Sequence, residues 1–386
     1  MKEGWEYKKI GDIATVVSGS TPQTSVEEFW GKGHYWVTPA ELDDKTVYVS
    51  KTERQITDAA LVKVKLQRLP KGTVLLSSRA PIGKVAICDV DMYCNQGFKN
   101  CICSDLVYNK YLFYFLKDKK EYLNSLGRGA TFKEISKGIV EKVIVPLPPK
   151  PTQLSIVSEL DKLNELIQIK KEQLKDYDTL AQSIFYEMFG DPVENEKGWE
   201  VKKLKDISRK IGDGLHGTPE YSELDTGWYF INGNNLENGC ISIKSTTKKV
   251  TDFVRKKYYV EMDDFTLLVS INGTLGKSAF YNGENVILGK SACYIKLNKD
   301  VNKLFIYEII RGEYFKRYAE SVCTGTTIRN VSLKAMREFP IIYPPLPLQH
   351  SFAQKIEQIE QQKATIQKTI TDLETLLAAR MQYWFD

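Results

Sequence analysis

The sequence predicts an α+β protein with an internal repeat, in which two similar α+β lobes are joined by two long antiparallel coiled-coil helices. Motifs of the first half of the chain return in the second half at a spacing of about 195 residues. After a proline-rich run in each half, apolar residues recur at alternating steps of three and four over about 30 residues. Before each run, short apolar segments alternate with turn residues and precede an aromatic-rich amphipathic segment.

Length and composition are those of a folded chain with more than one domain. The 386 residues are 42% hydrophobic and 27% charged, which is enough apolar surface for a core in each half and excludes a disordered chain. No stretch approaches the roughly 18–20 consecutive apolar residues that a membrane helix needs. We therefore expect a cytoplasmic protein with no membrane partner.

Charge and cysteine content further limit the kinds of partner and metal site that the protein can have. The formal net charge of +5 permits a polyanionic partner but does not require one. The seven cysteines are an odd number and none stands in a CxxC pair, so neither a disulfide framework nor a zinc ribbon is indicated. We expect reduced thiols, most of them buried.

The repeat is carried by matching segments spread over the whole chain. Solenoid repeats have periods of roughly 20–50 residues, so a much longer period indicates duplication of a lobe together with the segment that follows it. The matching segments, with shifts of 193 to 196 residues, are GWEYKKI at 4–10 with GWEVKKL at 198–204, RAPIGKVA at 79–86 with NGTLGKSA at 272–279, GAT at 129–131 with GTT at 325–327, and PP at 148–149 with PP at 344–345.

Two segments have the apolar spacing of coiled-coil helices. An average step of 3.5 residues, with no Gly or Pro inside, is typical of a coiled coil, and each helix would be about 50 Å long. We expect the pair to be antiparallel because one chain must return along its own path; two separate amphipathic helices, each packed on its own lobe, are the alternative. The positions are Ile156, Leu160, Leu163, Ile167, Leu174, Tyr177, Ala181, Ile184 and Met188 in the first segment, and Phe352, Ile356, Ile359, Ile366, Ile370, Leu373, Leu377 and Trp384 in the second, with Lys170, Lys363 and Arg380 at three intervening positions of the repeat.

These patterns predict the domain boundaries. The expected parts are a first lobe at 1–149, a first helix at 150–190, a second lobe at 191–345 and a second helix at 346–386. The proline-rich runs at 145–151 and 343–347 are predicted to be linkers, because proline continues neither a helix nor a central strand. Within the lobes, the expected strands include 74–78, 85–87 and 267–271, and the main helices are expected to begin after the capping residues Asp105 and Asn302.

Motifs of catalysis fail at required positions. The GKS segments at 276–278 and 289–291 resemble the end of a phosphate-binding loop, but Ile271 and Glu284 stand where its first glycine is required. Only His34, His216 and His350 are present, which leaves little material for a metal site or a catalytic triad. We therefore expect no catalytic residues, no bound metal and no cofactor.

Polar residues beside glycines recur at matching places in the two lobes and are candidates for contacts to nucleic acid. Such side chains can approach a phosphate chain closely and can form hydrogen bonds with base edges. Taken singly, each segment is more typical of an ordinary turn. The candidates are Ser18, Ser20, Thr21, Lys32, His34, Arg79, Lys84, Asn95, Gln96, Arg128 and Thr131 in the first lobe, and His216, Thr218, Asn234, Asn235, Asn272, Lys277, Thr324, Thr327 and Arg329 in the second.

The order of these parts resembles the DNA-specificity subunit of type I restriction-modification systems, over essentially the whole chain. The features that carry the resemblance are the GWE opening, the loop before a TP pair, the Gly-Lys turn, the G-x-T step and the PLPP exit, followed by a long helix and a second copy. The first lobe has SGSTP at 18–22 where the second has GLHGTP at 214–219, so the two lobes are expected to recognise different bases.

The resemblance implies that the lobes are target recognition domains and that the helices are spacers. It implies a subunit without catalytic activity that recognises an asymmetric bipartite target in double-stranded DNA. It also implies two kinds of protein partner: DNA methyltransferase (modification) subunits, which bind S-adenosylmethionine, and ATP-dependent nuclease (restriction) subunits.

Two other functions stay open at this point. A stand-alone DNA-modifying enzyme is disfavoured by the missing cofactor and carboxylate motifs. A coiled-coil interaction module with no role on DNA would be distinguished by its failure to bind random duplex at low salt.

Overall fold

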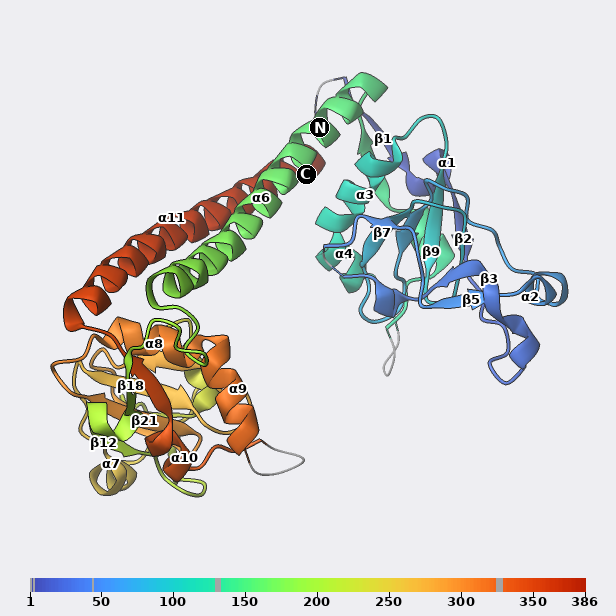
Figure 1. Cartoon of the computed structure of the whole chain (residues 1–386). Helices are drawn as coiled ribbons and strands as arrows, with labels where there is room; N and C mark the ends of the chain where they lie inside the picture. The colour runs from blue at the N-terminus through green and yellow to red at the C-terminus, as the bar shows by residue number, and fades with distance from the viewer. Residues whose placement is uncertain (1, 3, 44, 129–132, 324–328) are drawn as a thin grey trace. The chain divides into compact units, whose positions relative to one another are not determined.

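The computed structural model describes residues 2, 4–43, 45–128, 133–323 and 329–386 (Figure 1). The chain divides into two compact units, one formed by Met1–Glu172 with Gln367–Asp386 and the other by Gln173–Ile366. Each unit contains one lobe and a stretch of both long helices. No helix in the described part of the chain combines the length and the apolar character that crossing a membrane requires.

The first lobe contains a five-stranded sheet, a three-stranded sheet and a two-stranded sheet. The five-stranded sheet has the order β2 (Ala14–Ser18), β9 (Lys99–Cys103), β6 (Val74–Leu76), β7 (Val85–Cys88) and β4 (Tyr48–Val49). The three-stranded sheet has the order β5 (Arg54–Ile56), β3 (Trp30–Val37) and β8 (Tyr93–Cys94), and β1 (Glu6–Lys9) pairs with β10 (Ile144–Leu147). The helices of this lobe are α1 (Ile10–Ile13), α2 (Asp58–Lys63), α3 (Asn109–Asp118), α4 (Lys120–Ser125) and α5 (Lys137–Glu141).

The second lobe repeats this plan. One sheet has the order β12 (Ser208–Gly212), β21 (Ala292–Leu297), β18 (Thr266–Ser270) and β19 (Ser278–Phe280), and another has β13 (Tyr221–Ser222), β17 (Lys249–Val250), β14 (Tyr229–Ile231) and β20 (Val286–Leu288). Two-stranded pairs are β11 (Glu200–Lys203) with β22 (Pro340–Tyr343), and β15 (Leu236–Glu237) with β16 (Cys240–Ile241). The helices are α7 (Asp252–Tyr258), α8 (Lys303–Arg311), α9 (Glu313–Val322) and α10 (Leu333–Glu338).

The repeat extends to short elements that the sequence motifs did not include. A 3-10 turn follows β3 at Pro39–Glu41, and its counterpart at Gly233–Asn235 follows β14; each is closed by the side chain of its last residue. The helices α2 and α7 both begin after a threonine, Thr57 and Thr251, which are 194 positions apart. The two lobes are therefore copies of one fold.

The main sheet of each lobe is buried on both faces, which fixes the core. In the first lobe, Val74 and Leu76 of β6 pack in the cluster that contains the aromatic residues of α3. Leu75, between them, packs on the opposite face with Val37 and Phe98. Side chains of successive strand residues point to opposite faces, so a continuous apolar run is the expected sequence of such a strand.

The long helices are α6 (Lys150–Phe189) and α11 (Leu346–Phe385), of 40 residues each. In each unit they run side by side in opposite directions (Figure 1). Glu159 pairs with Arg380, and Lys171 pairs with Glu374, in the first unit, so residue numbers rise along one helix as they fall along the other. Every apolar position that the spacing predicts is buried or half-buried. The predicted fold class, including the antiparallel coiled-coil pair, is confirmed.

Local expectations were wrong at the proline-rich runs. Residues 144–147 and 340–343 form β10 and β22. Each strand belongs to a two-stranded sheet, where a proline can face away from its partner without breaking a ladder hydrogen bond. The following prolines, Pro151 and Pro347, lie in the first turn of α6 and α11, where the missing N–H has no helical partner to lose.

The helix starts were predicted correctly in one lobe only. Asn302 caps α8, and its side chain accepts hydrogen bonds from the N–H groups of Leu304 and Phe305 at 3.0 and 3.2 Å. In the first lobe, Asp105 does not cap the helix, which begins at Asn109 after Tyr108. The expected single helix is also two helices in each lobe, divided at Lys119 and at Gly312. The domain boundaries stay a prediction, because the compact units divide both long helices between them.

Candidate nucleic-acid interface

Two loops of candidate residues lie against each other in the first lobe. The loop after Ser18 packs on residues 94–96: Ser20 N–H donates to the Cys94 carbonyl oxygen at 3.0 Å. The Thr21 hydroxyl donates to the side-chain oxygen of Gln96. A Cβ at Gly19 would lie 2.1 Å from the Asn95 carbonyl oxygen, so only glycine permits this approach. The structure therefore brings together candidates that are about 75 residues apart in the sequence.

Strand β3 extends this surface. The indole Nε1 of Trp36 donates to the Ser20 carbonyl oxygen at 3.1 Å, and Asn95 N–H donates to the Val37 carbonyl oxygen at 3.2 Å. Lys32 and His34 lie on the same strand, and His34 Nε2 is 2.8 Å from the Asp58 carboxylate. Ser18, Ser20, Thr21, Lys32, His34, Asn95 and Gln96 thus belong to one surface, which we call the β3 surface.

Arg79 and Arg128 form a separate group around Glu134. Arg79 Nε lies 3.0 Å from the Glu134 carboxylate, and the buried Lys99 Nζ lies 3.2 Å from it. Burial opposes the ionisation of Glu134, but hydrogen bonds from Lys99 and Arg79 outweigh it and lower the pKa of Glu134. Arg128 N–H donates to the Glu134 carbonyl oxygen at 3.0 Å, and its side chain is exposed. Thr131 lies outside the described residues.

The matched lysines Lys84 and Lys277 differ in their surroundings. Lys84 Nζ donates to the carbonyl oxygens of Pro39 and Leu42 at 3.0 and 2.6 Å, so its ammonium group supports the 3-10 turn of its own lobe. Lys277 lines a cavity of about 470 Å³ together with Glu237 and residues of α6, α8 and α11. Neither lysine therefore lies with the other candidates of its lobe.

The loop at 212–219 of the second lobe packs on the end of β20. Leu215 N–H donates to the Leu288 carbonyl oxygen at 2.7 Å, and His216 Nε2 lies 2.8 Å from the Asp213 carboxylate. Thr218 lines a shallow groove of about 260 Å³ with Asn232 and Lys290, among others. The groove offers hydrogen-bond donors and acceptors from three separate segments of this lobe.

The remaining candidates of the second lobe have mixed roles. Asn235 is engaged within the lobe, because its side chain accepts from Asn232 N–H and donates to the Ser242 carbonyl oxygen, both at 3.0 Å. The adjacent Asn234 is exposed. Asn272 pairs through its backbone with residue 330, and Arg329 forms an exposed ion pair with Glu320 at 2.7 Å. Thr324 and Thr327 lie outside the described residues.

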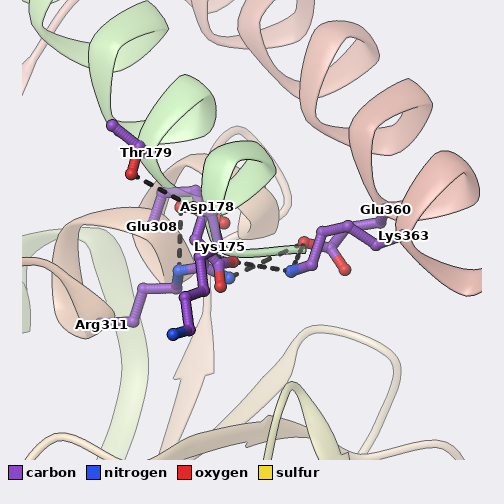
Figure 2. A network of polar contacts seen from close by, with 7 residues as sticks. All are labelled: Lys175, Asp178, Thr179, Glu308, Arg311, Glu360 and Lys363. Carbon is purple, nitrogen blue, oxygen red and sulfur yellow. Dashed lines mark hydrogen bonds and ion pairs between the residues drawn. The ribbon is translucent and has the colours of Figure 1, made fainter. Parts of the chain in front are cut away.

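A partly buried charge cluster joins α8 to the helix pair within the second unit (Figure 2). Arg311 lies 3.2 Å from Glu308 and 3.4 Å from Asp178, and Lys363 lies 2.8 Å from Asp178 and 2.9 Å from Glu360. Burial raises the pKa of Glu308 to about 7, and its Oε1 atom has no hydrogen-bond partner in the described structure. The surrounding ion pairs give this cluster a role in packing the lobe against its helices.

The described residues do not assemble a metal centre: no group of three His, Cys, Asp or Glu side chains among them could hold an ion. The two candidate surfaces consist of hydroxyl, amide, imidazole and cationic groups on loops and strand ends. Such groups suit hydrogen bonding to phosphates and base edges.

Sequence reasoning missed residues that the structure places at important positions. Arg54 and Trp30 stack on the β3 surface, and the buried side chains of Gln153 and Gln349 connect the lobes to the long helices. Arg54 has no neighbouring glycine, so the pattern of glycine-flanked polar residues does not include it. The shift of 196 residues between Gln153 and Gln349 was a usable signal, since two glutamines recur at one position of each predicted helix.

Comparisons with known proteins agree on one family. The model of the type I restriction modification DNA specificity domain matches residues 2–176 and 196–375. The type I restriction enzyme MjaIX specificity subunit of Methanocaldococcus jannaschii is 32% identical, over 96% of this chain and 90% of the relative.

Two solved structures are similar in fold. A chain from a structure that describes complex assembly and conformational transition of the type I R-M system has a TM-score of 0.66 and 17% identity, covering 100% of this chain and 98% of that one. The type I restriction-modification S subunit of M. genitalium has a TM-score of 0.52 and 16% identity, covering 99% and 96%. At these identities the likeness concerns the fold alone.

Proposed function

Because this chain belongs to the family of type I restriction-modification DNA specificity proteins, we propose that it selects the DNA target of such a system. The observation that carries the proposal is the double match of the family model, which covers each lobe once. One lobe that contacts a few base pairs gains about 1–3 kcal/mol per base pair, so two lobes in one chain multiply their discrimination.

The target of this chain is bipartite and asymmetric. The β3 surface carries Ser20, Thr21 and Gln96, whereas the loop of the second lobe carries His216 and Thr218. Since these groups differ, the two half-sites differ in sequence, unlike the palindrome that an identical pair of lobes recognises.

The subunit itself is not catalytic. Support comes from the incomplete phosphate-loop segments at 276–278 and 289–291 and from the relatives, which are named specificity subunits. Its protein partners are the methyltransferase (modification) subunits, which supply S-adenosylmethionine chemistry, and the ATP-dependent nuclease (restriction) subunits. It acts in the cytoplasm, because cellular DNA is the molecule that it must reach.

Selection from a randomised duplex library tests the target proposal. The full chain is mixed with its modification subunits, and the bound DNA is sequenced. We expect two different conserved blocks separated by a gap of constant length and no preferred sequence. A palindrome or a single uninterrupted block would contradict recognition by two unlike lobes.

Calorimetry tests the assignment of catalysis to the partners. The chain alone should bind no S-adenosylmethionine, while the assembled complex should bind it. Micromolar binding by the isolated chain would instead favour a stand-alone modifying enzyme. Failure of the assembled complex to bind duplex at low salt would favour an interaction module.

A further inference from the structure

Arg54 has a setting unlike that of the other cations on the β3 surface. It lies on β5, an edge strand of the three-stranded sheet, directly opposite Trp36 of β3. The central carbon of its guanidinium group is 3.5 Å from the ring centroid of Trp30 and 5.6 Å from that of Trp36. From this geometry we infer that Arg54 recognises a guanine in the half-site of the first lobe; the inference rests on the proposed function.

The aromatic support under Arg54 is itself held in place. Trp30 and Trp36 meet edge to face, with centroids 4.9 Å apart and planes at 81°. The indole N–H of Trp36 donates to the Ser20 carbonyl oxygen, and that of Trp30 donates to the Gln23 carbonyl oxygen at 3.3 Å. Both indoles are thus held by carbonyl oxygens of the loop at 18–23. Stacking fixes the guanidinium plane and reduces the rotamer entropy that binding would otherwise cost.

The N–H groups of Arg54 remain available to a ligand. In the described parts of this lobe, no hydrogen bond or ion pair engages its guanidinium group. Lys63 of α2 is paired with Glu28, whereas Lys32 on β3 has no ion pair in the described residues but lacks the aromatic support that fixes Arg54. Arg54 therefore offers a fixed plane with free donors along its edge.

The groove beside Arg54 contains both hydrogen-bond donors and acceptors, a combination that suits a base edge. It has a volume of about 280 Å³ and is lined by Trp30, Lys32, Glu53 and Gln55, among others. Lys32 and Arg54 attract a phosphate, but the Glu53 carboxylate opposes it and can accept a hydrogen bond from a cytosine amino group. The major groove of DNA admits a two-stranded β-ribbon, and an arginine that binds O6 and N7 of guanine is the commonest specific contact there. Arg54 and Glu53 together match a G·C pair.

The second lobe supplies a natural contrast. At a shift of 194 residues, Trp30 corresponds to Leu224, Trp36 to Phe230 and Arg54 to Lys248. Phe230 N–H donates to the Lys248 carbonyl oxygen at 2.8 Å, so these two residues lie next to each other, as Trp36 and Arg54 do in the first lobe. An ammonium group without an indole beneath it is a mobile point charge, which cannot form the paired hydrogen bonds of a guanidinium group. The second lobe therefore has no matching contact at Lys248, the position that corresponds to Arg54.

Binding to a set of duplexes that vary one base pair at a time tests the inference. The full chain with its modification subunits is compared with the variants Arg54→Lys, Arg54→Ala, Trp30→Ala and Lys248→Ala. Both Arg54 variants should lose roughly 10- to 100-fold in affinity for the preferred target and lose preference at a single G·C pair of one half-site. Trp30→Ala should weaken preference at the same pair, and Lys248→Ala should leave that preference unchanged.

Three results would overturn the inference. Weakening of all duplexes alike, with a salt dependence reduced by about one phosphate equivalent, would mean a backbone contact. If Arg54→Lys kept its preference for the G·C pair, a positive charge alone would be enough for that preference and paired hydrogen bonds would not be required. Unchanged binding in both Arg54 variants would place the residue off the DNA. These results differ from failure of the proposed function itself, in which case the unmodified protein would show no preferred DNA sequence at all.

Discussion

At the scale of residues, one buried glutamine connects each lobe to the long helix that follows it. Gln153 of α6 accepts from Tyr108 N–H at 2.7 Å and donates to the carbonyl oxygens of Leu106 and Pro148 at 3.0 and 2.9 Å. Gln349 of α11 accepts from Asn302 N–H at 3.2 Å in the same way. In both lobes the glutamine accepts from the N–H of the residue directly before the helix, Tyr108 before α3 and Asn302 before α8.

Replacing Gln153 by Leu should destabilise the first unit. The change leaves a buried N–H and buried carbonyl oxygens without partners, at a cost of about 1–3 kcal/mol per group. The free energy of unfolding, measured by urea denaturation, should fall accordingly. Gln168→Leu, on the exposed face of the same helix, is the control and should change it by less than about 0.5 kcal/mol. Equal effects of the two changes would show that burial of Gln153 contributes nothing.

Glu308 should make the second unit less stable as pH rises. Its pKa of about 7 in the folded chain exceeds the ordinary value of 4.5, so the folded state holds the extra proton between these values. Stability therefore falls as pH rises from about 4.5 to about 7. The groups that face Glu308 are Arg311, Glu360, Lys363 and Asp178.

Glu308→Gln should remove this dependence and give a chain that is at least as stable as the unmodified one at pH 8. Calorimetric melting of the full chain between pH 5 and pH 8 measures the slope. Glu357→Gln, an exposed carboxylate of α11, is the control and should keep the slope. An unchanged slope in Glu308→Gln would assign the pH dependence to other groups.

At the scale of elements, the apolar spacing predicted the helix pair well. A step of 3.5 residues maintained without Gly or Pro is typical of helices that pack along one another, and some of these positions, such as Ile156 and Leu160, also pack in the core of their lobe. The ends of shorter elements depend on tertiary contacts instead. Asp105 has the side chain of a cap, but α3 begins after Tyr108, whose N–H donates to Gln153, 48 positions after Asp105. No local rule contains that partner.

The candidate site, too, could be predicted only where a local sequence pattern marks it. Glycine-flanked loops marked Thr21 and Gln96 as candidates, and the structure brings their loops together, because glycine permits the close approach; their contact with DNA stays a prediction. Lys84 matched the pattern, yet its ammonium group is engaged by carbonyl oxygens of its own lobe. Arg54 lay outside the pattern, because its setting arises from side chains of two strands that only the fold brings together.

The packing of α11 should depend on its buried positions alone. Ile370 is 2% exposed and Leu376 is 46% exposed, and both lie in the stretch of α11 that belongs to the first unit. Ile370→Ala should lower the free energy of unfolding by about 2–5 kcal/mol through lost burial and the cavity left behind. Leu376→Ala, the control, should lower it by less than about 1 kcal/mol. Chemical denaturation followed by circular dichroism distinguishes the two, and equal losses would contradict the assigned helix contact.

At the scale of the whole molecule, both long helices pass from one unit into the other without a break. If the chain acts as proposed, we expect the length of these helices to set the number of base pairs between the half-sites, and the residues that contact DNA to determine which bases are recognised.

Paired insertions test this division of roles. Four residues added after Lys171 and four after Glu374, whose side chains pair at 2.6 Å, lengthen both helices by about 6 Å and nearly keep the apolar phase. Since duplex DNA rises about 3.4 Å per base pair, the preferred gap should grow by one to two base pairs while both half-sites stay the same. Methylation mapping with the assembled complex measures the gap. A new half-site with an unchanged gap would show that the helices recognise bases.

The first unit contains the last residues of the sequence, Gln367–Asp386, so the ribosome completes the second unit before the first. Met381 and Phe385 of α11 lie in the core of the first lobe, where Phe385 packs 5.4 Å from Tyr111, and Trp384 stacks on Trp5. All residues of the second unit are synthesised before residue 367. The first lobe therefore cannot complete its core until the end of α11 has been synthesised, by which time the second unit is complete. Chains truncated by a few dozen residues at the C-terminus should lose stability in the first lobe.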